Sequence, residues 1–371
     1  MENMYNSQKA LFEFLKAGLW EKPDANLNLN DKVDWEKVYQ LAEEQSVVGL
    51  VLAGIEHSRV KPPSELLLQW IGEVQIIEQQ NKAMNQFIAE LIVEMRKADI
   101  YTLLVKGQGI AQCYEKPLWR APGDVDLLLS DSNYEKAKAY LTPQADSVDT
   151  EYTSESHLSM NLRDYVVELH GSLHSRLSKR VDREIDAVQK DVFYGGNVRS
   201  WINGNTSVFL PSPDNDVIFV FTHFLKHFYV EGIGLRQICD WCRLLWTYKD
   251  SLNHELLKKR LRSMGLITEW KAFYNLANRY LGMPDYGSGL MVHDSRYDKM
   301  ADRIMEFVLE TGNFGHNRER EASKSYMGGK LVSTFRKLKD FGHHMKIFPI
   351  DSVKFFCYFA VDGIGGAMRG E

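Results

Sequence analysis

The hydrophobic pattern of this chain changes its period twice, and that change limits the folds the chain can adopt. Before residue 98 and after residue 211, apolar residues recur at helical spacing. Between these positions, short apolar runs alternate with Gly, Pro and Asn-Gly turn signals, which are typical of strands. This order predicts an α+β fold, in which a small mixed sheet is flanked by helical regions at both ends.

The pattern divides the chain into three expected parts: an N-terminal helical region (1–97), an α/β core (98–211) and a C-terminal helical domain (212–371). Expected strands cover 101–105, 125–129, 157–162 and 165–170, with further strand-like pieces in 192–210. Expected helices cover 64–97, 110–114, 132–141, 182–188, 214–229, 235–249, 254–264, 267–281 and 300–309. The apolar stretch 355–368 is too short to span a membrane, so we expect a buried helix there.

The composition excludes several classes of protein. The 371 residues carry a formal net charge of −5, which excludes a strongly basic protein that coats nucleic acid. Aromatic residues make up 12%, which is too many for a disordered chain. Four cysteines are too few for a disulfide scaffold, so we expect a reduced, cytoplasmic protein without a signal peptide. The single pair Cys239-x-x-Cys242 falls in an expected helix, which disfavours a zinc or redox site there.

The strongest candidate for a functional site is Gly123-Asp124-Val125-Asp126, at the start of an expected strand. Carboxylates two positions apart on a strand point to the same face. Two like charges held side by side are costly unless a cation lies between them, and oxygen ligands of this kind suit Mg²⁺. The alternative is an exposed strand start that carries two solvated acids.

A second candidate is the turn Lys106-Gly107-Gln108-Gly109, which follows one expected strand and precedes a short helix. Backbone N–H groups in such a turn, together with the helix N-terminus, favour phosphate. Taken alone, these residues also suit an ordinary strand-to-helix turn.

The third candidate is Glu168, which lies in the middle of an expected strand between apolar residues. An acid in that position needs a cation, a hydrogen-bond partner or an exposed face. If its strand pairs beside that of Asp124 and Asp126, Glu168 becomes a third carboxylate of one site. Otherwise Glu168 and His170 belong to a solvated polar face.

Together these motifs resemble the polymerase-β-like nucleotidyltransferase superfamily, and more closely the bacterial uncharacterised nucleotidyltransferases of the NTP_transf_5 type. The resemblance covers about 35–314 and is most specific in 104–141. The residues that carry it are Lys106, Gly107, Tyr114, Pro117, Arg120, Gly123 to Leu127, Glu168 to His170, His223, His227, Gly234 to Arg236 and Asp240.

The resemblance implies an enzyme that moves an NMP group from an NTP, such as ATP, to a hydroxyl acceptor and releases pyrophosphate. Asp124 and Asp126 would be the primary ligands of two Mg²⁺ ions, and Glu168 would help bind the second ion and activate the acceptor. The residues expected at the nucleotide are Lys106, Gly107, Gln108, Arg120 and Gly123.

Two of these residues have alternatives. Gln108 departs from the superfamily's Gly-Ser or Gly-Gly turn, because Gln is longer than Ser and changes how the turn meets a triphosphate. Arg120 could neutralise the leaving pyrophosphate with Lys106, or it could be the partner of Asp124 or Asp126 in a metal-free sheet.

A non-catalytic nucleotide-binding or interaction protein on the same fold is the main alternative function, because a fold does not fix a function. Gln108 and the unassigned third acid motivate it. A Glu168 carboxylate far from both Asp124 and Asp126 would favour this alternative.

A metallohydrolase based on His223, His227 and Asp240 is a second alternative. The two histidines share a helix face, but Phe224 stands where a zincin has Glu, so we expect no zinc. Asp240 is expected to pair with a basic residue, and Arg236, one helical turn away, offers the alternative of a helix-surface pair.

The C-terminal stretch is basic, with Lys330, Arg336, Lys337, Lys339, His343, His344 and Lys346. It could bind an acidic acceptor or form a solvated helix face. The sequence does not name the base of the nucleotide, the oligomeric state or the acceptor, which could be a small molecule, a sugar, a nucleic acid or a protein.

Overall fold

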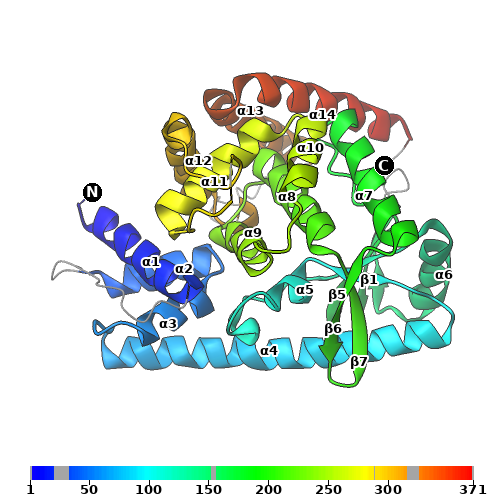
Figure 1. Ribbon diagram of the computed structural model, residues 1–371, viewed down its shortest axis with the longest axis horizontal. Coiled ribbons are helices and arrows are strands. Elements are labelled where there is room, and N and C mark those ends of the chain that lie inside the picture. The colour runs from blue at the N-terminus through cyan, green and yellow to red at the C-terminus, as the bar shows by residue number, and fades with distance from the viewer. Residues whose placement is uncertain (1, 21–32, 152–155, 288, 316–325, 370–371) are drawn as a thin grey trace.

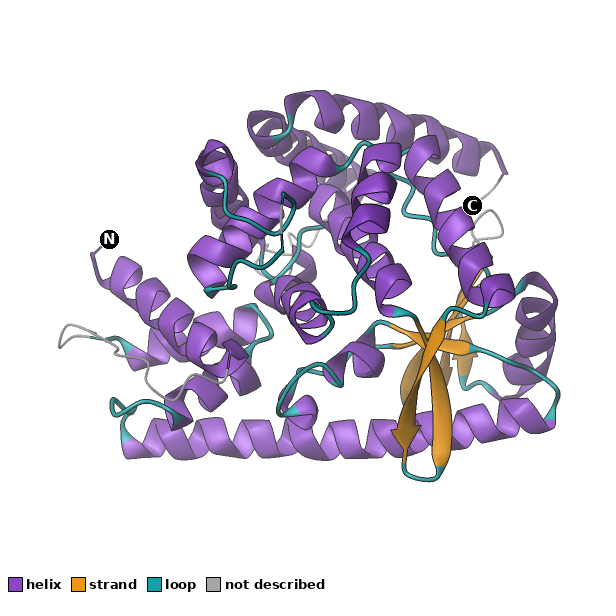
Figure 2. Ribbon diagram, in the orientation of Figure 1, coloured by secondary structure: helices purple, strands orange, loops and turns teal. Residues whose placement is uncertain are grey.

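The computed structural model describes residues 2–20, 33–151, 156–287, 289–315 and 326–369. Helices make up most of this part of the chain, and the strands gather at one end of the molecule (Figure 2). The predicted α+β fold with a small mixed sheet and helical flanks is confirmed.

Four helices, the last of them the longest, form the described N-terminal part (Figure 1). They are α1 (Glu2–Trp20), α2 (Trp35–Glu44), α3 (Val48–Glu56) and α4 (Ser64–Lys97). Helix α1 crosses α3 so closely that a Cβ atom on Gly18 would lie 2.0 Å from the Leu50 carbonyl oxygen. Helix α4 runs along the whole length of the molecule and has the predicted bounds.

The main sheet is mixed and has the strand order β1-β2-β5-β4-β3. Its strands are β1 (Leu103–Val105), β2 (Val125–Leu128), β3 (Ser147–Val148), β4 (His157–Leu162) and β5 (Tyr165–His170). Strands β2 and β5 are parallel, and the other neighbours are antiparallel. The predicted hairpin at Arg163-Asp164 is present, and both residues have positive φ.

The sheet has one apolar face and one face that is partly polar, because successive residues of a strand point to opposite sides. Val125, Leu127 and Leu129 are buried against the second half of α4 and against α6 (Asp131–Leu141). Asp126 therefore points to the other face.

The remaining elements of the middle part are α5 (Gly107–Ala111), α7 (Lys179–Gly195), β6 (Val198–Asn203) and β7 (Thr206–Pro211), with 3-10 turns at Pro117–Trp119 and Thr142–Gln144. Helix α7 is longer than the predicted 182–188 and includes 192–195, which the sequence pattern predicts to be strand-like, because the helix continues until Gly196 ends it with a positive φ. Helix α5 begins at Gly107 rather than 110, because the backbone turns sharply at Lys106. Strands β6 and β7 form a separate two-stranded ribbon.

The C-terminal part is helical, as predicted. Its helices are α8 (Pro213–Val230), α9 (Leu235–Thr247), α10 (His254–Met264), α11 (Ile267–Leu281), α12 (Asp298–Thr311), α13 (Tyr326–Ile347) and α14 (Pro349–Arg369), with 3-10 turns at Ser295–Tyr297 and Asn313–Gly315. The predicted 355–368 helix is the larger part of α14, but it is only partly buried: Phe355 is buried, whereas Phe356 and Cys357 are exposed. The side chains of 360–369 lie outside the described residues. None of the described helices combines the length and the apolar character needed to cross a membrane.

Two hydrophobic cores share helix α4. Trp70 and Val74, in its first half, are buried with the N-terminal and C-terminal helices. Phe87 and Leu91, in its second half, are buried against the sheet. The division at 97 and 211 stays a prediction.

Candidate active site

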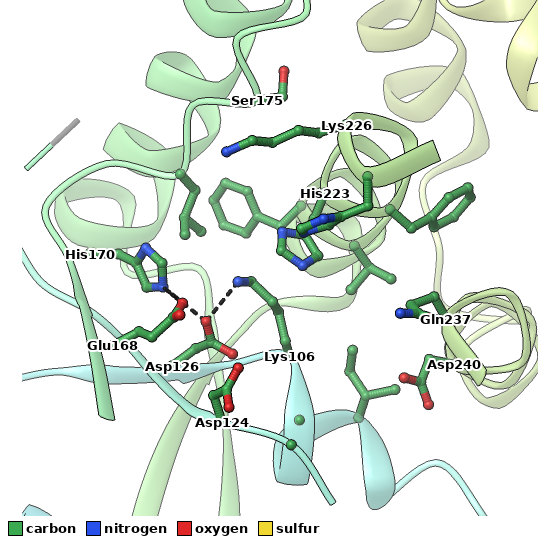
Figure 3. A pocket seen from close by; sticks show the side chains of 18 of the residues that line it. Lys106, Asp124, Asp126, Glu168, His170, Ser175, His223, Lys226, Gln237 and Asp240 are labelled. Carbon is green, nitrogen blue, oxygen red and sulfur yellow. Dashed lines mark hydrogen bonds and ion pairs between the residues drawn. The ribbon is translucent and has the colours of Figure 1, made fainter. Parts of the chain in front are cut away.

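A cavity of about 540 Å³ lies between the partly polar face of the sheet and helices α8 and α9. Figure 3 shows acidic side chains along one wall of this cavity and His223, Lys226 and Gln237 on the other. Because the two walls come from different parts of the chain, the cavity forms only when the C-terminal helices pack on the sheet.

Asp126 lies at the centre of the acidic wall and is mostly buried. Its Oδ1 atom accepts a hydrogen bond from Lys106 Nζ at 2.7 Å and lies 2.9 Å from His170 Nε2. The register explains the first contact: Val105 on β1 pairs with Asp126, so Lys106 follows at the end of that strand.

Glu168 joins the same cluster, because β5 pairs with β2 in parallel and places Glu168 directly beside Asp126. Its Oε2 atom lies 3.3 Å from His170 Nε2 and 3.4 Å from His157 Nε2. Although burial opposes it, hydrogen bonds with His157 and His170 hold the pKa of Glu168 well below its ordinary value. Glu168 is therefore beside Asp126, which is the arrangement that disfavours the non-catalytic alternative.

Asp124 differs from its two acidic neighbours. Its side chain reaches solvent, and it forms no hydrogen bond or ion pair with another residue in the described part of the chain. Partial desolvation in the cavity and the carboxylates of Asp126 and Glu168 raise the pKa of Asp124 to about 6. This carboxylate lacks a cation of its own.

The turn after β1 is built by two unusual backbone conformations. Lys106 has φ 58°, which is rare for a residue with a side chain, and Gly107 has φ 34°. A Cβ atom on Gly107 would lie 3.3 Å from the carbonyl oxygen of Asp124, so glycine allows the turn to approach the acidic strand. Lys106, Gly107 and Gly123 all line the cavity.

Gln108 lies elsewhere. Its side chain is buried against α4, where Nε2 donates a hydrogen bond to Asn81 Oδ1 at 2.6 Å. It is not among the residues that line the cavity, so the side chain of Gln108 does not face the acidic cluster.

Arg120 also lines the cavity, but its charge is paired with Asp240 rather than with Asp124 or Asp126. Arg120 Nε and Nη2 donate to the two oxygens of Asp240, both at 2.8 Å, and Tyr114 donates a third hydrogen bond to Asp240. Asp240 therefore pairs with a basic residue, as expected, but the pair is buried and its partner is Arg120, so the alternative of a surface pair with Arg236 is wrong.

Arg236 is the less satisfied cation of this wall. Its Nη1 atom donates to the carbonyl oxygens of Ala121 and Pro122 at 3.3 and 3.5 Å, and its Nε atom is buried without a hydrogen bond. Burial and the nearby Arg120 lower the pKa of Arg236 to about 10. This side chain lies beside Gly123, so an anion entering the cavity would meet it next to the acidic motif.

Helix α8 contributes His223 and His227, which both line the cavity. Burial and the nearby Lys106 lower the pKa of His223 well below its ordinary value. His227 Nδ1 lies 2.8 Å from Glu231 Oε2. Among the described residues, neither histidine belongs to a cluster with the geometry of a metal site. The metallohydrolase alternative thus finds no support.

Some residues of the cavity were not anticipated, above all His157, Lys226 and the segment 172–175. His157 pairs directly with His170 across the β4–β5 hairpin. The predicted turn at Arg163-Asp164 contained that signal, since counting back from it places these two histidines opposite each other.

The residues present fit a divalent cation, which the superfamily resemblance implies. Asp124, Asp126 and Glu168 offer carboxylate oxygens from adjacent strands, and hard divalent ions prefer such ligands. Asp124 supplies the observation that supports the fit, because its carboxylate has no cation partner among the described residues.

The comparisons with known proteins agree with this geometry. No curated protein and no solved structure shows significant similarity to the chain. Residues 31–282, about two thirds of the chain, match the family described as uncharacterised nucleotidyltransferase. The chain therefore belongs to this nucleotidyltransferase family.

Proposed function

We propose that this chain catalyses the transfer of an NMP group from an NTP to a hydroxyl acceptor, with release of pyrophosphate. The observation that carries the proposal is the carboxylate cluster of Asp124, Asp126 and Glu168 on two adjacent strands, at the wall of a cavity that also contains cationic side chains. The family match supports the class of reaction.

Asp124, Asp126 and Glu168 would hold two divalent cations, at least one of them Mg²⁺, which would stabilise the attacking and leaving oxygens of an in-line displacement. Glu168, which lies beside both His157 and His170, would orient the acceptor hydroxyl. Asp124, at the solvent side, would meet the nucleotide first.

Cationic residues would position the triphosphate. Lys106 Nζ lies 2.7 Å from Asp126 Oδ1, and its ammonium group would be placed to neutralise a phosphate oxygen of the triphosphate. Arg236 has spare donors beside Gly123. Arg120 is held by both oxygens of Asp240, so it would contribute a fixed positive charge at the wall rather than a mobile contact.

The position of Gln108 bears on the non-catalytic alternative. The departure from the superfamily's turn motivated that alternative, but the Gln108 side chain is engaged by Asn81 outside the cavity. The backbone N–H groups of the turn stay free to face phosphate, so the substitution does not weaken the proposed donor site.

A thermal-shift panel tests the proposal. The melting temperature of the wild type is measured with ATP, GTP, CTP and UTP, each with and without Mg²⁺. A ligand that binds only the folded state stabilises it by about 2.7 kcal/mol at a hundred times its Kd. We expect a Mg²⁺-dependent rise with at least one nucleotide, which would name the donor.

Three variants make the panel specific. Asp124→Asn and Asp126→Asn should lose the nucleotide-dependent rise, while Asp131→Asn, an exposed acid of α6, should keep it. Nucleotide binding or pyrophosphate release that persists in Asp126→Asn would contradict the proposal. No rise with any nucleotide and no pyrophosphate release would favour the non-catalytic alternative.

The predicted cytoplasmic location accords with the state of the cysteines. Cys113, Cys239 and Cys242 are buried free thiols, and Cys357 is an exposed one. Free thiols persist in a reducing compartment.

A further inference from the structure

The polar face of the sheet carries two histidines that the proposed Mg²⁺ site does not use. His157, at the start of β4, and His170, at the end of β5, are paired across the hairpin. Their rings are stacked, with centroids 4.8 Å apart and planes inclined by 13°. The Nε2 atoms of His157 and His170 lie 3.4 and 3.3 Å from Glu168 Oε2, so two nitrogens and one oxygen lie close together.

Three of the distances between these atoms match those between neighbouring ligands of one metal ion. An ion about 2.1 Å from each ligand separates neighbouring ligands by about 3.0 Å in an octahedron and about 3.4 Å in a tetrahedron. Glu168 Oε2 lies 3.3 and 3.4 Å from the two nitrogens, and Asp126 Oδ1 lies 2.9 Å from His170 Nε2. One ligand atom from each of His157, Glu168 and His170 lies within 4.8 Å of the others.

We propose that His157, His170 and Glu168, with Asp126 as the fourth ligand, form a site for a divalent first-row transition ion rather than for Mg²⁺. Imidazole nitrogen suits ions such as Zn²⁺ and Co²⁺, whereas Mg²⁺ selects oxygen ligands. The carboxylate of Asp124 is outside this set and offers only oxygen ligands, which suit Mg²⁺. The two metal positions of the cavity therefore take different ions.

Binding requires one local movement. The lone pairs of two nearly parallel rings cannot both point at one ion, so one imidazole turns about its Cβ–Cγ bond when the ion enters. His157 is half-buried and lines the cavity, which leaves room for this rotation.

Only the catalytic use of the bound ion depends on the proposed function. Binding itself is measured without a nucleotide. A protein that binds the transition ion but no nucleotide would contradict the proposed function alone, and one that binds Mg²⁺ with a nucleotide but no transition ion would contradict this inference alone.

The test is Co²⁺ titration of the full-length, untagged, chelator-treated protein, followed by visible absorption in the presence of excess Mg²⁺. All proteins carry Cys357→Ser, because that exposed thiol is a competing ligand. We expect one Co²⁺ per chain that excess Mg²⁺ does not displace. His157→Gln should weaken Co²⁺ binding by at least about tenfold. Loss of a residue that only hydrogen-bonds to a metal ligand already costs about this much affinity, so loss of a ligand should cost no less.

His174→Gln is the matched control. His174 also lines the cavity, but its Nε2 atom lies 2.6 Å from Asp186 and not in the cluster, so this variant should bind Co²⁺ like the wild type. Equal binding by His157→Gln and the wild type would overturn the proposal, as would displacement of the ion by Mg²⁺.

A second variant separates direct ligation from misfolding. His157→Cys places a thiolate at the same position and should restore Co²⁺ binding, with a new sulfur-to-cobalt charge-transfer band in the near ultraviolet. A folded His157→Cys protein without that band would show that residue 157 does not touch the ion.

Discussion

Arg120 and Asp240 form a buried ion pair in which each charge compensates the other. Both are almost fully buried, and they are joined by two hydrogen bonds of 2.8 Å. Breaking a buried pair by removing one partner leaves a charge without compensation, which costs much more than the pair itself contributes.

Asp240→Asn should therefore destabilise the protein by about 3–5 kcal/mol, because the buried guanidinium of Arg120 loses its counter-ion. Urea denaturation followed by circular dichroism measures the change. Lys136→Ala is the control, since it removes a partner of the exposed pair with Asp99 and should change stability by less than about 1 kcal/mol. Similar effects in both variants would mean that Arg120 finds another partner or reaches water.

Glu269, near the start of α11, is a second residue for which burial determines the charge, here by favouring the protonated carboxyl group. It is fully buried, and neither carboxylate oxygen accepts a hydrogen bond in the described part of the chain. Burial and the neighbouring Asp351 raise the pKa of Glu269 well above its ordinary value. The folded protein therefore keeps this proton after the unfolded chain has released it.

This difference gives the stability a pH dependence of known sign. The contribution of the protonated Glu269 is fully present below the ordinary pKa of Glu and is lost as the pH rises toward the raised value, by up to about 1.4 kcal/mol per pH unit. Glu269→Gln should remove that loss, so it should stabilise the protein more at pH 8 than at pH 5. Melting curves at both pH values measure this, with the exposed Glu255→Gln as control. An equal effect of Glu269→Gln at both pH values would contradict it.

At the scale of elements, the crossing of α1 and α3 depends on the absence of side chains. A Cβ atom on Gly54 would lie 1.8 Å from the carbonyl oxygen of Phe14, and the facing position in α1 is Gly18. Two helices can approach this closely only where both positions are small. The contact is backbone on backbone, so no change of rotamer can relieve an added methyl group.

Gly54→Ala should destabilise the protein by about 1–3 kcal/mol or more, because α1 must move away from α3. Gly72→Ala, in the interior of α4 with no atom near its Cβ position, should have the opposite sign and stabilise by about 1 kcal/mol through helix propensity. Thermal unfolding of both variants decides this. A Gly54→Ala protein as stable as Gly72→Ala would mean that the helices do not pack at this distance.

Contacts within one element or hairpin could be predicted from the sequence, whereas contacts between distant elements could not. The Arg163-Asp164 turn set the register of β4 and β5, and alternation along β2 set the face of Asp126, because both are local rules. The side chain of Gln108 could not be placed, because its partner Asn81 lies in another helix. The Arg120–Asp240 pair joins residues 120 positions apart, and helix spacing says only which residues share a face.

At the scale of the whole molecule, α4 joins the two hydrophobic cores. Its first half packs with the helices and its second half with the sheet, so neither core is complete without it. Because one continuous helix belongs to both, we expect the described cores to unfold together.

Leu91→Ala tests this coupling. Leu91 is fully buried on the sheet side, so its truncation should cost about 2–5 kcal/mol. The transition should move as a whole when it is followed both by far-ultraviolet circular dichroism, which reports mainly on the helices, and by tryptophan fluorescence. Two separate transitions in the variant would show that the cores unfold independently.

The pair of Arg120 with Asp240 also sets a limit on how modular this fold can be. All three carboxylates lie before residue 170, so a shortened chain ending after β7 would keep the whole Gly-Asp-x-Asp signature. It would lose both Asp240 and helix α9, which carries Asp240 against Arg120. Transplanting the sheet alone into another scaffold would thus expose Arg120 and remove the second wall of the cavity.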